Sequence, residues 1–304
     1  MAVVIGPAIL AAIHARLDRV LAAPCVRLRP LIIDGTALGF VDDGRIERLA
    51  HFGRRLFRVQ ADSVEFARDL PNAAARSAAM SEVTAVLRAE GALPGWRDER
   101  YRVATDFDSP PALCIERGAA RYFGVRTWAA HVNGIVQTAA GEPSMWLARR
   151  SPGKAIDPGM LDNLVAGGIA AGLSIAATVV KEAWEEAGID EPLAATARPA
   201  GVVHVLRALP DGLQRETIFA HDLELPATFR PVNQDGEASD HRLVDIEGAA
   251  RAIAADGGPD DVTVDASVVM LDYLIRRGSI GPDDRRFAAL AALRNRGAAE
   301  PRTG

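Results

Sequence analysis

Apolar residues near the N-terminus recur at the spacing of a helix. Ile9, Leu10, Ile13, Leu17 and Leu21 fall on one side of a helix over residues 7–22, and polar residues occupy much of the other side. This pattern predicts a helix that packs on one face. Because the apolar stretch has no basic leader and soon meets charged residues, we do not expect a signal peptide here.

The next hundred residues alternate between short strands and helices. The predicted elements are strands within residues 31–41, around the Asp34-Gly35 turn, and over residues 101–104, and helices over residues 73–90 and 116–122. Gly91 and Pro94 supply the stop signals expected after the longer helix. We therefore predict a small N-terminal α/β domain over residues 1–124.

After Val125 longer apolar segments predict a larger sheet. Two strands, over residues 127–138 and 145–151, form a hairpin around Gly141-Glu142-Pro143, and a Pro/Gly-rich loop follows over residues 151–163. Beyond residue 190 the pattern predicts strands over residues 201–206 and 216–223, and helices over residues 247–255, 265–277 and 284–295. We expect this second unit to span residues 125–304.

Length and composition are those of a globular protein. A chain of 304 residues is long enough for two domains with separate cores. With 49% hydrophobic and 25% charged residues, the composition indicates neither disorder nor a fibre. No apolar run approaches the roughly 18 residues needed to cross a bilayer, so we expect no membrane partner.

Charge and cysteine content exclude other classes. A net charge of −5 argues against a protein that binds a nucleic-acid backbone, which usually carries an excess of Lys and Arg. Cys25 and Cys114 lie far apart and show no spacing typical of a zinc site or a disulfide framework. We therefore expect a cytoplasmic protein.

The chemistry is concentrated in GGIAAGLSIAATVVKEAWEEAGI, residues 167–189. Ser174 can cap a helix that ends at Gly188, and on it Glu182, Glu185 and Glu186 share one face. Like charges at this spacing repel by roughly a few tenths of a kcal/mol per pair, a conflict that a divalent cation removes. The alternative is the solvated face of a surface helix, since glutamate favours helices and is common at surfaces.

The residues around the glutamates favour the cation. Oxygen ligands suit Mg²⁺, with Mn²⁺ as the other candidate, and Mg²⁺ can bind phosphate oxygens at the same time. Gly167 and Gly168 allow the backbone to approach a metal cluster and phosphates closely. The sequence therefore predicts a site for a small-molecule pyrophosphate at the start and on one face of this helix.

This segment resembles the signature of the Nudix hydrolases, G-x5-E-x7-R-E-U-x-E-E-x-G-U, where U is aliphatic. Gly167, the three glutamates, Gly188 and Ile189 match it. Lys181 replaces the usual arginine and loses its two-pronged geometry, and Leu173 stands where the first glutamate is expected. The resemblance implies a Nudix α/β/α sandwich with a mixed sheet, here with a small N-terminal α/β domain and C-terminal helices.

The flanking segments resemble one branch of that family. The segments that carry this likeness are WRDERY (96–101), ERGAARYFGV (116–125), HVNGIV (131–136), ARRSPGK (148–154), PGMLDNLVAGGI (158–169) and DGE (235–237). The branch is related to the C-terminal part of fungal thiamine pyrophosphokinases and carries a dedicated N-terminal domain. The resemblance implies a substrate like thiamine diphosphate, or a damaged form of it, that is cut to the monophosphate.

Several other residues have two interpretations, one in substrate binding and one that is only structural. Arg149, Arg150 and Lys154 could hold the terminal phosphate or form a solvated basic loop. His131 and Asn133, on one strand face, could touch the organic group, or His131 could be a hydrogen-bonded interior residue.

Glu237, in a later loop, and Trp184, between the helix glutamates, also have to be assigned a role. Glu237 follows the predicted strands in a loop where Nudix enzymes often place an acidic residue that binds metal or acts as general base. If Glu237 is only part of an acidic turn, it has no such role. Trp184 cannot face the metal with the glutamates, and we assign it to core packing.

The resulting hypothesis is a Mg²⁺-dependent hydrolase. Glu182, Glu185 and Glu186 would hold the cation, and Glu186 or Glu237 would take the proton from the attacking water. Two alternatives stay open: a hydrolase of a nucleoside diphosphate derivative such as ADP-ribose or a dinucleotide, and a pyrophosphate-binding module inactivated by Leu173. The hydrophobic N-terminal helix also makes a homodimer a hypothesis.

Overall fold

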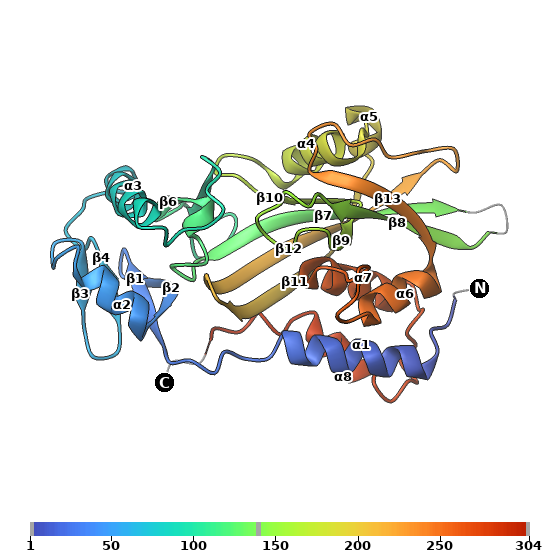
Figure 1. The fold of residues 1–304 in the computed structure, drawn as a ribbon, viewed down its shortest axis with the longest axis horizontal. Coiled ribbons are helices and arrows are strands. Elements are labelled where there is room, and N and C mark those ends of the chain that lie inside the picture. Colours follow the sequence, from blue (N-terminus) through green and yellow to red (C-terminus); the bar gives the residue numbers. More distant parts are fainter. Residues whose placement is uncertain (1–2, 138–140, 302–304) are drawn as a thin grey trace.

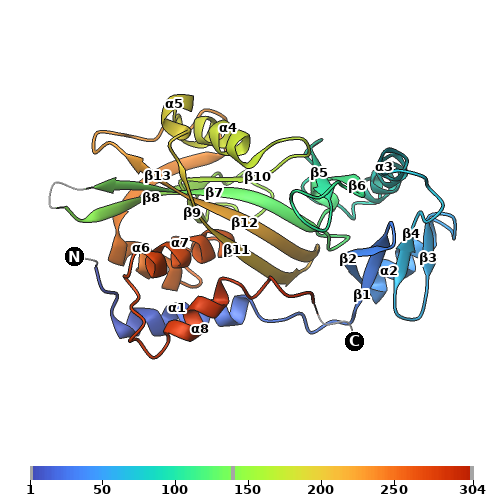
Figure 2. The same cartoon turned by 180° about the vertical axis from the view of Figure 1, so that it is seen from behind.

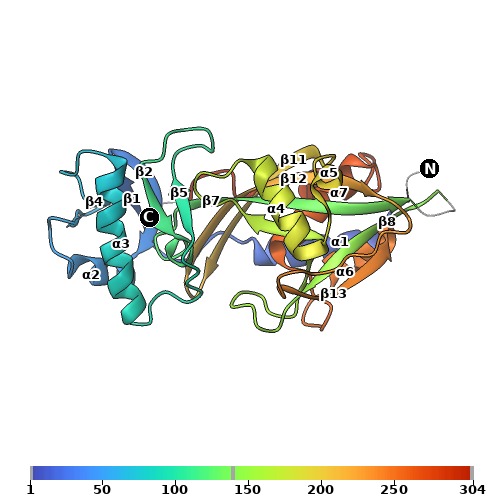
Figure 3. The same ribbon diagram turned by 90° about the horizontal axis from the view of Figure 1, so that it is seen from above.

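The computed structural model of the chain describes residues 3–137 and 141–301, and its elements form two lobes at opposite ends of an elongated molecule (Figure 1). One lobe holds the short strands and helices of the first third of the chain. The other is built on a long mixed sheet with helices on both faces. Figure 3 shows the two lobes from above, with strand β7 starting next to the smaller one.

The smaller lobe confirms most of the expected N-terminal elements. Its four-stranded sheet has the order β2-β1-β4-β3, and strands β5 and β6 form a separate hairpin. The bounds are β1 Leu28–Ile33, β2 Thr36–Asp42, α2 Asp43–Ala50, β3 Phe57–Val59, β4 Val64–Phe66, α3 Ala73–Ala89, β5 Arg100–Val103 and β6 Leu113–Glu116. The turn between β1 and β2 has Asp34 and Gly35 at positive φ, as its sequence predicted.

The prediction of a helix over residues 116–122 is wrong. Only a single 3-10 turn, η1 Arg117–Ala119, forms there. Gly118, in its middle, favours helix poorly, and a Cβ built on it would lie 3.1 Å from the carbonyl oxygen of Gly95. The chain is therefore held close to the preceding loop instead of extending a helix.

The larger lobe contains a seven-stranded sheet in which β11, β12, β7, β8 and β13 follow one another. Strand β10 also pairs with β7, and β9 with β8. The bounds are β7 Arg126–Gln137, β8 Pro143–Arg150, β9 Leu161–Asn163, β10 Val165–Gly168, β11 Arg198–Leu209, β12 Gly212–Leu225 and β13 Ala238–Asp245. The expected hairpin is confirmed as β7 and β8, although Thr138 lies outside the described residues.

Helices cover both faces of this sheet (Figures 1 and 2). Helices α4 (Ile175–Ala187) and α5 (Glu191–Ala194) lie on one face, and α6 (Ile246–Ala254) and α7 (Val264–Arg276) lie on the other. Alternation along β7 supplies both cores, since Ala129 and Ile135 pack with α6 and α7, whereas Ala130 and Val132 pack with α4. The α/β/α sandwich with a mixed sheet is confirmed.

Helix α1 (Pro7–Val20) lies under the larger lobe, next to α6 and α8 (Phe287–Leu293). Its apolar residues Leu10, Ile13 and Leu17 are buried in the same core as the C-terminal helices. Arg16 also donates hydrogen bonds to the carbonyls of Ile253 and Val262 and to the Ser267 hydroxyl. The expected boundary assigned this helix to the N-terminal domain, because periodicity indicates a buried face but not its partner.

This packing also removes the reason for expecting a homodimer. The apolar face of α1 is covered within the chain, so it gives no support to a second copy. In the ranges that the structure describes, no helix has both the length and the apolar character that spanning a bilayer requires.

The two lobes join tightly at Gly124. The N–H of Phe40 donates to the carbonyl of Phe123, and the buried Arg215 of β12 donates to the carbonyl of Gly124. Gly124 has a φ of +54°, and a Cβ placed there would lie 2.2 Å from the carbonyl oxygen of Phe40. Both conformation and space therefore require glycine at this junction.

We predict that Gly124→Ala lowers the free energy of unfolding by at least about 2 kcal/mol. The left-handed conformation contributes roughly 1 kcal/mol, and displacing packed backbone contributes about 1–3 kcal/mol more. The matched control is Gly53→Ala, because Gly53 has a φ of +81° but nothing within 4 Å of its Cβ position. Urea unfolding should show a loss for Gly53→Ala of only about 1 kcal/mol. Equal losses would contradict the steric account.

Candidate active site

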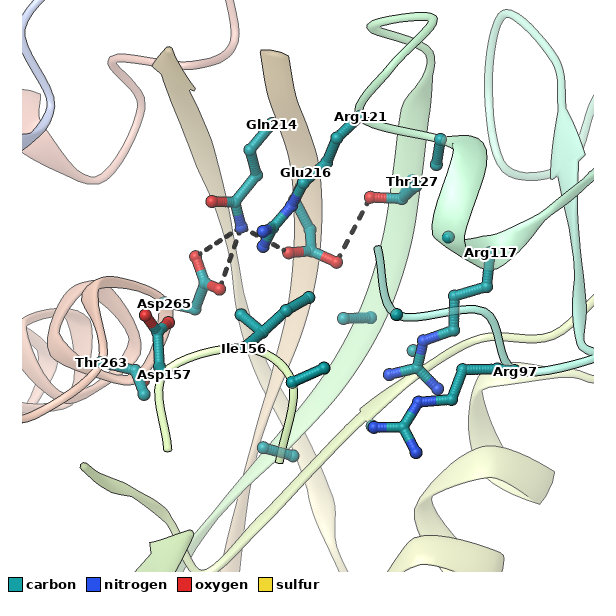
Figure 4. Close-up of a pocket in the computed structure, with 18 of the residues that line it drawn as sticks. Arg97, Arg117, Arg121, Thr127, Ile156, Asp157, Gln214, Glu216, Thr263 and Asp265 are labelled. Atoms are coloured by element: carbon teal, nitrogen blue, oxygen red, sulfur yellow. Dashed lines mark hydrogen bonds between the residues drawn. The ribbon is translucent and has the colours of Figure 1, made fainter. Parts of the chain in front are cut away.

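A pocket lies between the two lobes, where residues far apart in the sequence converge (Figure 4). Strands β7, β10 and β12, helix α4 and the loop after β8 form one side. The N-terminal lobe forms the other. Polar residues and glycines that line it include Arg97, Tyr101, Arg117, Arg121, His131, Arg150, Lys154, Asp157, Gly167, Gly168, Glu182, Gln214, Glu216, Glu237 and Asp265.

Two glycines of β10 set the position of the pocket floor. A Cβ on Gly167 would lie 2.3 Å from Cγ of Glu182, and a Cβ on Gly168 would lie 1.7 Å from the hydroxyl oxygen of Tyr101. The side chains of Glu182 and Tyr101 therefore lie against the strand in space that any other residue at these positions would occupy. The sequence predicted that these glycines approach a metal cluster and phosphates, whereas in the structure the side chains of Glu182 and Tyr101 occupy that space.

Helix α4 forms as the sequence predicted. Ser174 caps it by accepting the N–H of Ala177, and Gly188 ends it in the left-handed conformation with a φ of +63°. Leu173, which stands where the Nudix pattern has its first glutamate, is 37% exposed and is not among the residues that line the pocket.

The three helix glutamates have different environments. Glu182 lies in the pocket, and burial raises its pKa although Lys181 opposes this. Glu185 accepts a hydrogen bond from Nζ of Lys181 at 2.6 Å and does not line the pocket. Glu186 is 7% exposed and accepts the N–H of Ala166 at 2.8 Å. Burial, followed by the nearby Glu182, raises the pKa of Glu186 to about 8.

These carboxylates have the donor chemistry that a divalent cation prefers. Within the described ranges, no three acidic, histidine or cysteine side chains are already arranged as a metal-binding group. Glu182 and Glu186 are nevertheless buried close enough for one charge to raise the pKa of the other. The donor set therefore fits a hard cation once Glu182 and Glu185 exchange their hydrogen bonds with Lys181 for the ion.

The three basic residues expected at the phosphate are not equivalent. Lys154 lines the pocket and pairs with Glu237. Arg150 also lines it, but it donates to Asp162 and to the carbonyls of Ile156 and Asp157, so it holds the shape of this loop. The expectation for Arg149 does not fit the structure. As the neighbour of Arg150 on a strand it points to the other face, where it binds the carbonyls of Gly159 and Pro259 and the Asp260 carboxylate.

Glu237 and His131 also reach the pocket. Glu237 is 36% exposed and lies 3.9 Å from the nearest guanidinium nitrogen of Arg97, in addition to its pairing with Lys154. His131 is buried and shares a hydrogen bond of 2.9 Å with the side chain of Asn163. Asn133 does not line the pocket, since its fully buried side chain bonds Asn163 and Asp222.

Trp184 corrects a second expectation, because it is 53% exposed and not packed in the core. Glu182 and Glu186 contact strand β10, and Trp184 lies on the face of the helix that is turned to solvent. Val179 and Ala183 of the same helix do pack in the core, and their side chains are small enough to let α4 lie close to the sheet.

The N-terminal lobe supplies residues that sequence reasoning did not assign to the site. Tyr101, on β5, is 5% exposed, and the guanidinium of Arg117 lies 5.6 Å from its ring centroid. Arg97 precedes β5 and Arg121 follows η1. The segments WRDERY and ERGAARYFGV contain all four residues. Their arginine and tyrosine content was the available signal, but nothing in the sequence indicated that they face the glutamate helix.

The opposite wall of the pocket carries several acidic side chains, and the charge of Arg121 acts on two of them, Glu216 and Asp157. Gln214 donates from its amide nitrogen to Glu216 and to Asp265, each at 3.0 Å, and thereby connects strand β12 to helix α7 (Figure 4). Burial, then Asp265, raises the pKa of Glu216, and the same two causes raise the pKa of Asp157. No ion pair within the described ranges involves Glu216, Asp157 or Asp265.

The chain matches known proteins over both lobes. A sequence model described as a NUDIX domain matches residues 127–263, and one described as a domain of unknown function matches residues 17–127. Nudix hydrolase 24, chloroplastic, of Arabidopsis thaliana is 36% identical over 268 residues, which are 88% of this chain and 72% of that protein.

Two further similarities are weaker or shorter. Nudix hydrolase 20, chloroplastic, of Arabidopsis thaliana is 38% identical over 222 residues, or 73% of this chain, which spans only 58% of that relative. A crystal structure from Deinococcus radiodurans covers 58% of this chain and 99% of its own, with 23% identity and a TM-score of 0.42.

The NUDIX model spans the helix that carries Glu182, Glu185 and Glu186, and the likeness to Nudix hydrolase 24 extends over most of both chains. This protein therefore belongs to the Nudix hydrolase family.

Proposed function

We propose that this Nudix hydrolase cuts thiamine diphosphate, or a damaged form of it, to the monophosphate. The observation that carries the proposal is the opposite charge of the two pocket walls. Arg97 and Arg117 lie on one side of the cavity and Asp157, Glu216 and Asp265 on the other, where Arg121 is the cation near Glu216 (Figure 4). Thiamine diphosphate has the complementary distribution, since an anionic diphosphate is joined to a cationic thiazolium and to an aminopyrimidine with N–H donors.

The metal would be Mg²⁺ or Mn²⁺, held by Glu182, Glu185 and Glu186. When bound, such a cation neutralises charge on phosphate oxygens and lowers the pKa of water. Glu186 or Glu237 accepts the proton of the attacking water. Glu237 can do so only after it leaves Lys154, which then becomes available to a phosphate oxygen.

Activity against a panel of substrates tests the reaction. With Mg²⁺, we expect hydrolysis of thiamine diphosphate or its oxidised analogues, and not of ADP-ribose, NADH or nucleoside triphosphates. Glu185→Gln should lower kcat by about 100-fold or more, which corresponds to roughly 2.7 kcal/mol of lost transition-state stabilisation. The control is Glu82→Gln, an exposed glutamate on helix α3 of the other lobe.

Other results of the panel would overturn parts of this proposal. Hydrolysis of ADP-ribose or NADH alone would replace thiamine by a nucleoside diphosphate derivative. Binding of a diphosphate without any turnover would indicate a non-catalytic module. In that case Leu173→Glu, which restores the missing carboxylate of the pattern, should raise activity from near zero.

The raised pKa of Glu186 predicts how the metal-free protein responds to pH. A carboxyl whose folded pKa of about 8 lies above its unfolded value, near 4.3, contributes stability that is complete below the unfolded value. That contribution is lost as pH rises through the folded pKa. In EDTA, the Tm of the wild type should therefore fall more between pH 5 and pH 8 than the Tm of Glu186→Gln. Parallel curves would contradict the assignment.

The acidic wall predicts which organic group is preferred. Glu216→Gln should raise KM for thiamine diphosphate by about tenfold, because a hydrogen bond to a charged group is worth roughly 1.5–3 kcal/mol. Hydrolysis of an alkyl diphosphate, which has no cationic ring, should be unchanged. Since the amide avoids burying a charge, Tm should not fall at pH 7. The matched control is Glu224→Gln on the same strand, where the glutamate side chain is 66% exposed. An equal rise in KM for both diphosphates would refute a role in ring selection.

A further inference from the structure

Arg97 and Arg117 come from the N-terminal lobe, yet they extend side by side into the pocket (Figure 4). Arg97 lies in the loop before β5, and Arg117 follows β6 directly. The two lie 20 residues apart in sequence but are neighbours across the β5–β6 hairpin, where Arg100 pairs with Glu116. The hairpin therefore brings two guanidinium groups to the same wall.

One buried carboxylate fixes the backbone of both arginines. Glu116 is 7% exposed, and its Oε1 accepts the N–H of Arg97 at 2.9 Å and the N–H of Gly118 at 3.3 Å. The Arg117 side chain is held in addition by Glu99, at 2.9 Å, and by the ring of Tyr101. The two arginines are thus positioned by residues of the N-terminal lobe and not by the glutamates of helix α4.

The two side chains keep donors available for a ligand. Among the described residues, the Arg97 guanidinium makes no hydrogen bond, and its nearest carboxylate, that of Glu237, is 3.9 Å away. Arg117 uses one guanidinium nitrogen for Glu99. A guanidinium presents five N–H donors in a fork that matches phosphate oxygens.

Positive charge accumulates at this wall. Lys154 has its pKa lowered first by burial, and Arg150, Arg117 and Arg97 lower it further. Arg97 and Arg117 line the same pocket as Glu182, the glutamate that the helix turns into the pocket. Like charges held this close repel one another, and a polyanion removes the conflict.

We propose that Arg97 and Arg117 bind the phosphate oxygens of the substrate, so that the N-terminal domain supplies half of the diphosphate subsite. The inference rests on the proposed function only in locating the reaction in this pocket. It gives the N-terminal domain a role in binding the substrate, although the Nudix signature lies outside that domain. The ligand class is a diphosphate, recognised by its charge and not by its organic group.

Calorimetric binding of inorganic pyrophosphate in EDTA tests the proposal without turnover or metal. The wild type should bind, and Arg97→Gln and Arg117→Gln should each weaken binding by at least about tenfold. Arg58→Gln is the matched control, because Arg58 lies in β3 of the same lobe, is 41% exposed and pairs with Asp69 away from the pocket. It should bind as the wild type does.

Conservative variants separate binding from folding. Arg117→Lys keeps the charge but loses the fork, so it should recover only part of the affinity. If Arg117→Gln fails to fold, Arg97→Gln decides the matter, since its half-exposed side chain makes no hydrogen bond in the described part of the chain. Unchanged pyrophosphate binding in Arg97→Gln and Arg117→Gln, or absence of binding in the wild type, would overturn the proposal.

Steady-state kinetics then distinguishes this proposal from the proposed function. With thiamine diphosphate, Arg97→Gln should raise KM with little change in kcat, whereas Glu185→Gln lowers kcat. If the wild type does not hydrolyse thiamine diphosphate but binds pyrophosphate through the arginines, the substrate is wrong and the subsite stands. If hydrolysis occurs and KM is unaffected in Arg97→Gln, the subsite is wrong and the function stands.

Discussion

The contact at Gly167 and Gly168 is the constraint on which the rest of the site depends. At these two consecutive positions of β10, the strand touches Glu182 of helix α4 and Tyr101 of the N-terminal lobe, at distances that leave no room for a Cβ. A larger residue at either position would displace the side chain of Glu182 or of Tyr101 from its place in the pocket. Because both walls of the pocket are fixed from this strand, its shape depends on backbone that carries no side chain.

Charge is distributed in the pocket in a way that a fold selected only for stability would avoid. Glu182 and Glu216 line the pocket as carboxyls whose pKa values are raised by burial, the pKa of Glu186 next to Glu182 is raised in the same way, and Lys154 is an amine whose pKa burial lowers. Each of these groups becomes more favourable when an oppositely charged ligand arrives. A cation at the helix and a diphosphate at the arginines would compensate both sets together.

In the order of the sequence, the smaller lobe is inserted between helix α1 and the remaining elements of the larger lobe. Helix α1 packs with α6 and α8, so residues on either side of the N-terminal lobe belong to the same core. Arg215 of β12 binds the carbonyl of Gly124 at the entry to β7 and pairs with Glu300 near the C-terminus. The smaller lobe is therefore held at both of its ends, which keeps Tyr101, Arg97 and Arg117 against the glutamate helix.

The sequence by itself determined what depends on neighbours along the chain. Spacing and capping placed α4 between Ser174 and Gly188, the family signature marked its glutamates, and two apolar segments around a Gly/Pro turn identified the hairpin of β7 and β8. Only the tertiary structure decided which lobe covers α1, that Arg149 turns away while Arg150 lines the pocket, and that Arg97 and Arg117 line the same pocket as Glu182. Those outcomes depend on contacts between residues distant in sequence, for which local pattern and propensity carry no information.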